Sequence, residues 1–366
     1  MRIFLCAPWD GTALGRIAQY ATKALVAEGH VVEVFDFRRR PYSRWPFVQP
    51  LKRALRRVWP KAPSPYDVAG VRGAVDRDVN RRLLERCRAF GPALLLVFCG
   101  ENIGAQTLET VRADGITTAN WFHDSLIYAS RRELVRNVLP VYDLLFLVDD
   151  LEVLKEAGVS LPQARTLPLA CSADVHRPLD LSADERERWG ADVAFVGTLT
   201  PGRIKVLKGL TEFRLGIWGS WQERDPGLAP YYRERNVSGE DAAKIYNAAK
   251  VNLDIHVLFG QEQAIYNVTP RVFEVPGCGG FLVTGSTPQL ERLYAAGGEV
   301  AVYRNTDEMR ERIRYYLDHE EERRAVARRG HERAQREHTY AQRLRSLIGA
   351  VEDLRKKAAR PTEARP

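Results

Sequence analysis

The sequence predicts an α/β protein built from two doubly wound domains in series, and three observations support this prediction. Short apolar runs alternate with helical patterns, which is typical of βαβ units and a parallel sheet. The length of 366 residues fits two domains of roughly 150–200 residues each. Residues 168–192 are polar and turn-rich, and they separate two sets of strand-like runs. We therefore expect an N-terminal domain over residues 1–172, a C-terminal domain over 173–335, and a C-terminal helix with a disordered tail over 336–366.

The expected strands lie on both sides of this turn-rich stretch. Six precede it, at residues 3–7, 31–37, 93–99, 118–122, 144–148 and 166–169. Five follow it, at residues 193–197, 214–218, 251–255, 280–284 and 300–303. Open parallel sheets bind ligands at the carboxyl ends of their strands, so we expect two Rossmann-like domains that face a cleft.

Composition predicts a soluble, cytoplasmic protein with anionic partners. No run of 18 or more apolar residues occurs, and the N-terminus "MRIFLCAPWDG" has charge and turn residues where a signal peptide needs a long apolar segment. The five cysteines are odd in number and scattered, which indicates reduced core side chains rather than disulfides or zinc ligands. A formal net charge of +8 favours nucleotides, phosphates, acidic glycans or membrane surfaces, without choosing between them.

A glycine turn follows the first expected strand. Gly11 and Gly15 in "APWDGTALGRIAQY" would let the loop approach a ligand closely, before a helix whose N-terminus attracts anions. The fingerprint G-x-G-x-x-G is absent, and a tight strand-to-helix turn explains the two glycines equally well.

The second half repeats this arrangement in "VAFVGTLTPGRIKVLKGL". A strand ends at Gly197 and Thr198, and Arg203, Lys205 and Lys208 crowd the start of the next expected helix. Cations there oppose the helix dipole, so a bound anion would account for them. A solvated basic face is the alternative.

Two opposite charges lie one helical turn apart in "NVTPRVFEVPGCGGFLVTG". If a helix begins near Thr269, Arg271 and Glu274 are i, i+3 neighbours at its start. The carboxylate has the chemistry to accept two hydrogen bonds from a ribose diol, while the guanidinium meets a phosphate or the carboxylate itself. An ordinary helical ion pair is the alternative.

The same stretch resembles a known family. Together with "VAFVGTLTPGR" and "WFHDSLIY", the residues from Asn267 onward look like GT-B glycosyltransferases, and most of all like the CgeB spore-maturation-like family. The resemblance covers most of residues 90–350. It implies a GT-B fold with a donor-binding C-terminal domain, an acceptor-binding N-terminal domain, and a C-terminal helix that returns toward the N-terminal domain.

The resemblance also implies roles for individual residues. Glu274 takes the place of the glutamate that binds the donor ribose, Arg203 that of a diphosphate-binding arginine, and Val237 lies in the base-contacting loop. Related retaining families carry a second glutamate eight positions before the first. Here that position is Tyr266, and Asn267 and Arg271 are the motif members present instead, which bears on whether transfer retains the sugar's configuration. We expect a donor site that also includes Gly11, Gly197, Thr198, Lys208 and His256.

Catalytic candidates follow an apolar strand of the N-terminal half. His123 and Asp124 in "ANWFHDSLIY" are expected to face the cleft, where either could deprotonate an acceptor hydroxyl or position the donor sugar. A cap or turn role is the alternative for both. Arg203 is the expected cation for the departing diphosphate.

No metal or other cofactor is expected. The only D-x-D is Asp76-Arg77-Asp78, which lies in a charged helical stretch without a preceding strand. GT-B enzymes stabilise the leaving diphosphate with cations and helix N-termini instead.

An unusual basic and aromatic segment spans residues 38–66, with nine Lys or Arg and no acidic residue. Such a mixture suits an anionic membrane surface or an acidic acceptor, and a basic insertion without a dedicated partner is the alternative. No nucleic-acid-binding motif accompanies it, so no nucleic acid is expected.

The sequence therefore favours a metal-independent, retaining glycosyltransferase that uses a nucleotide-sugar donor. The acceptor, whether glycan, small molecule, lipid or protein, stays open. The rivals are a nucleotide-sugar-processing enzyme of the same fold, such as an epimerase, and a catalytically silent binding module of a surface assembly.

Overall fold

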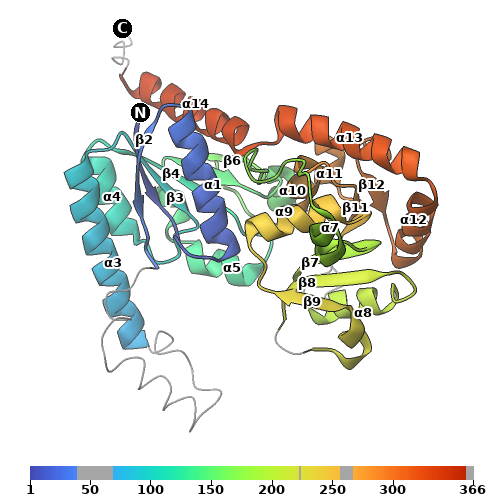
Figure 1. Ribbon diagram of the computed structural model, residues 1–366. Helices are drawn as coiled ribbons and strands as arrows, with labels where there is room; N and C mark the ends of the chain where they lie inside the picture. Colours follow the sequence, from blue (N-terminus) through green and yellow to red (C-terminus); the bar gives the residue numbers. More distant parts are fainter. Residues whose placement is uncertain (39–68, 222–223, 256–266, 360–366) are drawn as a thin grey trace. The chain divides into compact units, whose positions relative to one another are not determined.

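The structure, a computed structural model, describes residues 1–38, 69–221, 224–255 and 267–359. Contacts divide the chain into two compact units (Figure 1). Unit 1 comprises Met1–Leu167 and Leu344–Pro366, and unit 2 comprises Pro168–Arg343. The sequence predicts the two boundaries after residues 172 and 335.

Unit 1 is built on a parallel sheet of six strands in the order β2-β1-β3-β4-β5-β6. Its strands are β1 (Arg2–Cys6), β2 (Val31–Phe35), β3 (Leu94–Phe98), β4 (Thr117–Phe122), β5 (Leu144–Leu147) and β6 (Ala164–Thr166). Its helices are α1 (Ala13–Ala27), α3 (Ala69–Phe90), α4 (Ala105–Ala113), α5 (Ala129–Val135), η2 (Leu139–Val141), α6 (Leu151–Glu156) and most of α14 (Tyr340–Ala359). All five residues of β3 are buried, as expected for a central strand covered on both faces.

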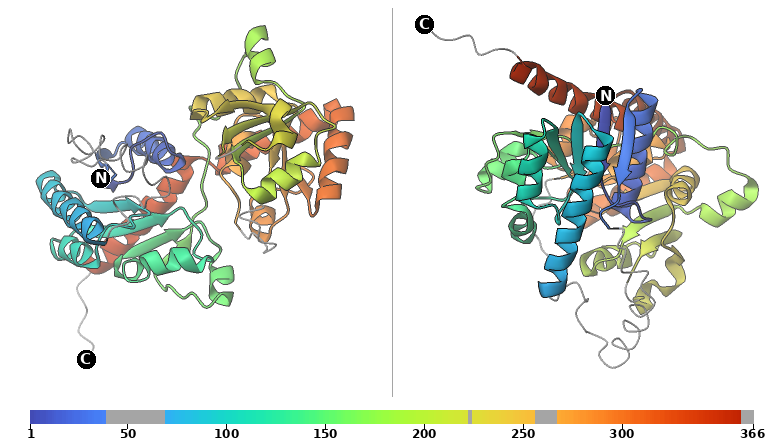
Figure 2. Two further views of the ribbon diagram at one scale, coloured as in Figure 1. Left: turned by 90° about the horizontal axis from the view of Figure 1, so that it is seen from below. Right: turned by 90° about the vertical axis from the view of Figure 1, so that its left-hand side faces the viewer.

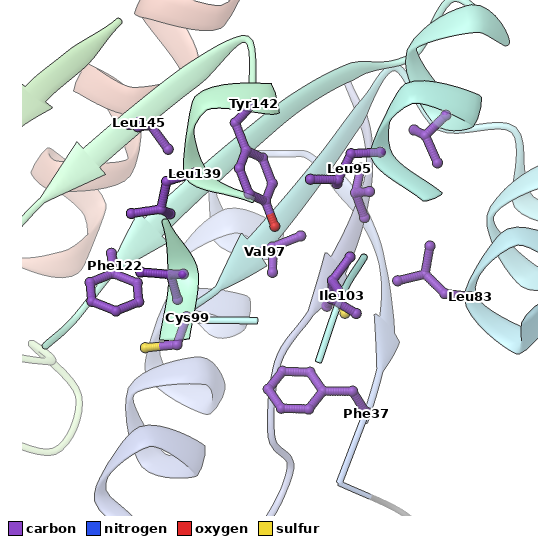
Figure 3. Packing of buried hydrophobic residues seen from close by; sticks show 14 of the residues in the cluster. Phe37, Leu83, Leu95, Val97, Cys99, Ile103, Phe122, Leu139, Tyr142 and Leu145 are labelled. Carbon is purple, nitrogen blue, oxygen red and sulfur yellow. The ribbon is translucent and has the colours of Figure 1, made fainter. Parts of the chain in front are cut away.

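Helices cover both faces of this sheet. Because β1 connects outward to β2 through α1, whereas the later crossovers run the other way, right-handed connections place α1 opposite α3 and α4. Buried side chains of α3, α4, η2 and the strands form one core cluster, part of which Figure 3 shows around Leu95, Val97 and Tyr142. The long C-terminal helix α14 packs against the rest of unit 1 (red in Figure 2), where Arg355 donates to the Ala93 carbonyl oxygen at 2.8 Å.

Unit 2 repeats the plan with a parallel sheet in the order β12-β11-β10-β7-β8-β9. Its strands are β7 (Val193–Thr198), β8 (Leu215–Ser220), β9 (Tyr232–Arg235), β10 (Val251–Asp254), β11 (Leu282–Gly285) and β12 (Ala301–Tyr303). Its helices are α7 (Ala183–Trp189), α8 (Pro201–Lys208), η3 (Pro226–Tyr231), α9 (Gly239–Ala248), α10 (Arg271–Gly277), α11 (Pro288–Leu293), α12 (Thr306–Asp318) and α13 (Glu320–Glu337). The expected class, two Rossmann-like α/β domains, is confirmed.

The strand order of unit 2 reverses between β7 and β10. From β7 the chain moves outward to β8 and β9, then returns to β10 and continues to β11 and β12. Such a switch point leaves a crevice at the carboxyl ends of the two central strands, because the loops that follow them turn to opposite sides. The residues after β7 and β10 are therefore the first place to look for a ligand site.

Three elements differ from the sequence-based expectations. β9 was not expected, because "YRER" is polar and forms an edge strand with an irregular register against β8. β6 ends at Thr166, before the expected run 166–169 is complete. The expected C-terminal helix is interrupted between α13 and α14, where Thr339 pairs with Cys171 in an isolated bridge. The expected tail at residues 360–366 lies outside the described residues.

Gly219 provides a stability test of the β7–β8 contact. Its φ of +126° suits glycine alone, and a Cβ there would lie 2.2 Å from the Gly197 carbonyl oxygen. Gly219→Ala should lower the free energy of unfolding by about 3 kcal/mol or more in urea titrations followed by circular dichroism. Gly297→Ala is the matched control, because its φ is +75° but its Cβ would meet open space, and it should cost about 1–2 kcal/mol. Equal losses would show that the strand contact relaxes freely.

Candidate functional site

The candidate site lies at the switch point of unit 2. β7 ends in Gly197 and Thr198, and the Thr198 hydroxyl lies 2.9 Å from that of Ser220 at the end of β8. A Cβ on Gly197 would lie 2.9 Å from Arg271 Nη1, so the absence of a side chain there lets the arginine reach the strand end. The site therefore combines polar strand ends with an inserted guanidinium.

A buried ion pair joins β10 to α10. Arg271 Nε donates to Asp254 Oδ1 at 2.8 Å, and Asp254 is fully buried. The hydroxyls of Thr269 and Thr284 donate to the same carboxylate at 3.0 and 3.2 Å. Burial is the largest effect and lowers the pKa of Arg271, but Asp254, together with Tyr246 and Glu274, raises that pKa on balance. Arg271 is thus a fixed, permanently charged group.

Arg271 also contacts β7 directly. Its Nη1 donates to the Val196 carbonyl oxygen at 2.9 Å, and its guanidinium lies 5.7 Å from the centre of the Phe195 ring. One side chain thereby ties β7, β10 and α10 together at the strand ends.

Arg203 is the second guanidinium of the site. It is 6% exposed, and it donates from Nη1 to the Thr198 carbonyl oxygen at 2.9 Å and from Nε to the Ile255 carbonyl oxygen at 3.1 Å. Burial, and then the charge of Arg271, lower the pKa of Arg203 to about 10, so it stays protonated at neutral pH. Two guanidinium groups therefore share this strand edge with the buried carboxylate of Asp254, which favours a bound anion.

Glu274 lies one turn after Arg271, and its side chain is 21% exposed. Its Oε2 accepts a hydrogen bond from the Tyr246 hydroxyl at 3.4 Å, and its Oε1 lies 4.0 Å from His176 Nε2. The alternative of an ordinary helical ion pair between Arg271 and Glu274 is wrong, because the ion-pair partner of Arg271 is Asp254. The expected contact of Arg271 with a phosphate stays a prediction. The Glu274 carboxylate instead faces the Tyr246 hydroxyl and the His176 ring.

Lys208 does not lie where it was expected. The helix α8 spans only eight residues, so Lys205 and Lys208 lie in its last turn, where the helix dipole favours cations. Lys208 pairs with Asp225 at 2.9 Å. The prediction that these lysines crowd the helix start is therefore wrong, and of the three cations only Arg203 lies in the first turn.

The remaining unit 2 candidates differ in how far they can be placed. Val237 is partly buried and precedes Ser238, which caps α9, while the Asn236 amide donates to the Gly219 carbonyl oxygen at 2.8 Å. Asn267 is partly buried shortly before α10. His256 and Tyr266 lie outside the described residues.

In unit 1 the glycine turn has a local explanation. A Cβ on Gly15 would lie 2.1 Å from the Asp10 carbonyl oxygen, whereas a Cβ on Gly11 would have no atom within 4 Å. Thr12 caps α1 and accepts from the Gly15 amide. The tight turn thus requires Gly15 and leaves Gly11 without a steric role among the described residues.

His123 follows β4, as expected, but it is a poor candidate for a base. Its ring packs against Phe98 and Trp121, with centroids 4.6 and 4.9 Å away, and within the described part of the chain neither ring nitrogen has a hydrogen-bond partner. Burial lowers the pKa of His123 to about 3. The ring is therefore neutral at physiological pH but only weakly basic, so it suits hydrogen bonding better than proton abstraction. Asp124 is more exposed and lies 3.4 Å from Arg131.

Sequence reasoning missed the residues that support the site. Asp254 and Thr284 lie in strands that were expected, and Tyr246 and His176 lie in segments that were assigned no role. An acidic residue at the end of an apolar run, as in "VNLDI", was the available signal for Asp254, because a buried carboxylate requires a partner.

The described residues contain no group of three or more His, Cys, Asp or Glu side chains placed to hold a metal ion. Asp76 and Asp78 lie within α3, as expected, and Asp78 pairs with Arg81 and Arg82. No helix in this part of the chain is long and apolar enough to cross a membrane.

The buried pair makes a direct stability prediction. Asp254→Asn leaves the Arg271 charge buried without its counterion, so the free energy of unfolding should fall by about 3–5 kcal/mol in urea titrations. Glu212→Gln removes the exposed partner of Arg310 and Arg314 and should cost less than about 1 kcal/mol. Similar losses in the two variants would mean that Asp254 is not the essential counterion.

Comparison with known proteins agrees with this architecture. Residues 203–349 match the family model described as Glycosyl transferase-like. No curated protein matches the chain.

Several solved structures match nearly the whole chain. Their sequence identities are low, so the likeness concerns the fold alone. Sucrose-phosphate synthase from Thermosynechococcus elongatus has a TM-score of 0.66 and 15% identity, covering 98% of this chain and 100% of its own. Anabaena Alr3699/HepE in complex with UDP and glucose has a TM-score of 0.65 and 10% identity, covering 96% and 100%. A glycosyltransferase from Rickettsia africae has a TM-score of 0.62 and 10% identity, covering 97% and 98%. The chain has the GT-B fold, with two Rossmann-like domains.

Proposed function

We propose that the protein is a glycosyltransferase that moves a sugar from a nucleotide-sugar donor to an acceptor hydroxyl. The observation that carries the proposal is the gathering of Arg203, Arg271 and Glu274 at one edge of the second sheet, within the stretch that matches the Glycosyl transferase-like model. A nucleotide sugar has a diphosphate and a ribose diol, which suit two guanidinium groups and one partly exposed carboxylate.

In this proposal each charged side chain has a separate task. Arg203 and Arg271 bind the diphosphate, since each guanidinium keeps N–H groups beyond the two contacts described above. As the bond from sugar to phosphate breaks, negative charge grows on the leaving oxygen, and the fixed Arg203 charge stabilises it. Glu274 accepts hydrogen bonds from the ribose, and the loop at Val237 lies beside the base.

UDP-sugars are the first donors to test, because the structures of Anabaena HepE are described as complexes with UDP and with UDP-glucose.

In unit 1, neutral His123 is proposed to hydrogen-bond a sugar hydroxyl, and Asp124 is the remaining candidate for the base. Transfer is proposed to retain the anomeric configuration and to need no metal. Proton NMR of the product and activity in EDTA test these two points.

Acceptor-dependent release of the nucleoside diphosphate tests the transferase itself. A panel of UDP-, ADP- and GDP-sugars should give nucleotide release that rises when a glycan, lipid or small-molecule acceptor is added, whereas an epimerase would turn over without one.

Glu274→Gln should weaken binding of the released nucleotide by about 1–3 kcal/mol in calorimetry, since it loses a charged hydrogen-bond acceptor, and it should keep the fold. Unchanged affinity would remove Glu274 from the site, and binding without any turnover would favour a silent binding module.

We also propose that residues 38–66 dock on an anionic membrane surface. Apart from Arg38, this segment lies outside the described residues, and the proposal rests on its nine basic residues and interleaved aromatics. Liposomes that contain anionic lipid should sediment the protein at low salt and release it at high salt, because screening weakens the attraction. Equal recovery of the protein on neutral and anionic liposomes would contradict membrane docking.

The expected cytoplasmic location stays a prediction.

A further inference from the structure

His176 lies in the turn-rich stretch before β7, yet it is only 1% exposed. Its ring is next to Glu274, with 4.0 Å between Nε2 and Oε1. At this distance the contact is electrostatic rather than a full hydrogen bond. A buried imidazole that faces the proposed ribose-binding carboxylate is unlike a residue that only fills the core.

The tautomer of His176 is set by the backbone. The Ser172 amide donates to His176 Nδ1 at 2.9 Å, so Nδ1 must be the unprotonated, accepting nitrogen. The proton of the neutral ring is then on Nε2, the atom that faces Glu274. A second proton on Nδ1 would break the bond to Ser172, which favours the neutral ring.

The surrounding contacts hold this arrangement in place. Gln335 Nε2, from α13, donates to the carbonyl oxygens of both His176 and Gly277 at 3.1 Å. A Cβ on Gly277 would lie 3.1 Å from the His176 Cβ, so the glycine allows α10 to approach the segment that carries His176 closely. The histidine and the helix that carries Glu274 therefore form one packed unit.

We propose that His176 is a positioning residue that orients the Glu274 carboxylate for a ribose diol, and this rests on the proposed function. One carboxylate oxygen faces the His176 N–H and the other accepts from the Tyr246 hydroxyl. Both donors are neutral, so they fix the direction of the carboxylate without neutralising it, and it remains a strong acceptor. The negative charge is left for the two ribose hydroxyls.

The test compares ligands that differ only in the diol. Calorimetry gives the dissociation constants of UDP and of 2′,3′-dideoxyuridine diphosphate, with the ADP and GDP pairs as alternatives if UDP does not bind. The wild-type chain should bind the ribose form about 10–100-fold more tightly. His176→Phe should weaken the ribose form about 5–20-fold and leave the dideoxy form within about twofold, while His176→Gln, which keeps an N–H donor, should recover part of the loss.

His331→Phe is the matched control. This histidine also packs on α10, but its Nδ1 lies 3.1 Å from the Pro276 carbonyl oxygen rather than at the carboxylate, so diol discrimination should not change. If the wild-type chain does not discriminate, the proposed role of Glu274 fails. If it does, and His176→Phe discriminates equally or weakens both ligands alike, the role of His176 is overturned.

A measurement on the wild-type chain covers the case in which His176→Phe does not fold. With ¹⁵N-labelled histidine, NMR should show His176 as the Nε2–H tautomer, and its Nε2–H signal should move when the ribose form is added but not with the dideoxy form. An Nδ1–H tautomer, or equal shifts with both ligands, would overturn the proposal.

Discussion

The buried pair of Asp254 and Arg271 is the interaction on which the candidate site depends. Asp254 is the last residue of β10, and its carboxylate accepts hydrogen bonds from Thr269, Thr284 and Arg271. Its backbone carbonyl oxygen accepts from the Tyr303 hydroxyl at 2.7 Å, which extends the network to β12. Removing two charges from water is costly, and the full set of hydrogen bonds offsets that cost. The strand ends of half the second sheet are thereby held in one arrangement.

This pairing also decides what Glu274 can do. An arginine and a glutamate at i, i+3 on an exposed helix would pair with each other and leave little for a ligand. Here Asp254 forms the ion pair with the guanidinium, and in the described part of the chain Glu274 contacts the Tyr246 hydroxyl and the His176 ring. The two charges stay separate in function, and a ligand with one anionic part and one hydroxyl-rich part complements both.

Local pattern was enough to predict most of the fold. Central parallel strands such as β3 are buried on both faces and read as continuous apolar runs, so their positions followed from the sequence. β9 did not, because an edge strand with one buried residue has no such signal. The position of Lys208 was misjudged because it depends on where α8 ends, and helix ends are set by capping and tertiary contacts that composition does not encode.

The site was predictable only where its chemistry is local in sequence. Arg271 and Glu274 lie three residues apart and could be recognised together, whereas the partner of Arg271 lies 17 residues away, across a segment that includes residues 256–266. His176 is farther still, and nothing in "SADVHRP" indicates a neighbour at Glu274.

The partners of Arg271 and Glu274 are therefore set by the topology, which brings β7, β10 and α10 to one edge of the sheet, rather than by spacing in the sequence.

The topology also determines the surroundings of Arg203, which is buried and yet charged. Two backbone carbonyl oxygens hold its guanidinium beside Arg271, although burial and that second charge both oppose protonation. An anion that binds beside the two guanidinium groups stabilises this arrangement further. Anion binding should therefore raise the free energy of unfolding of the protein.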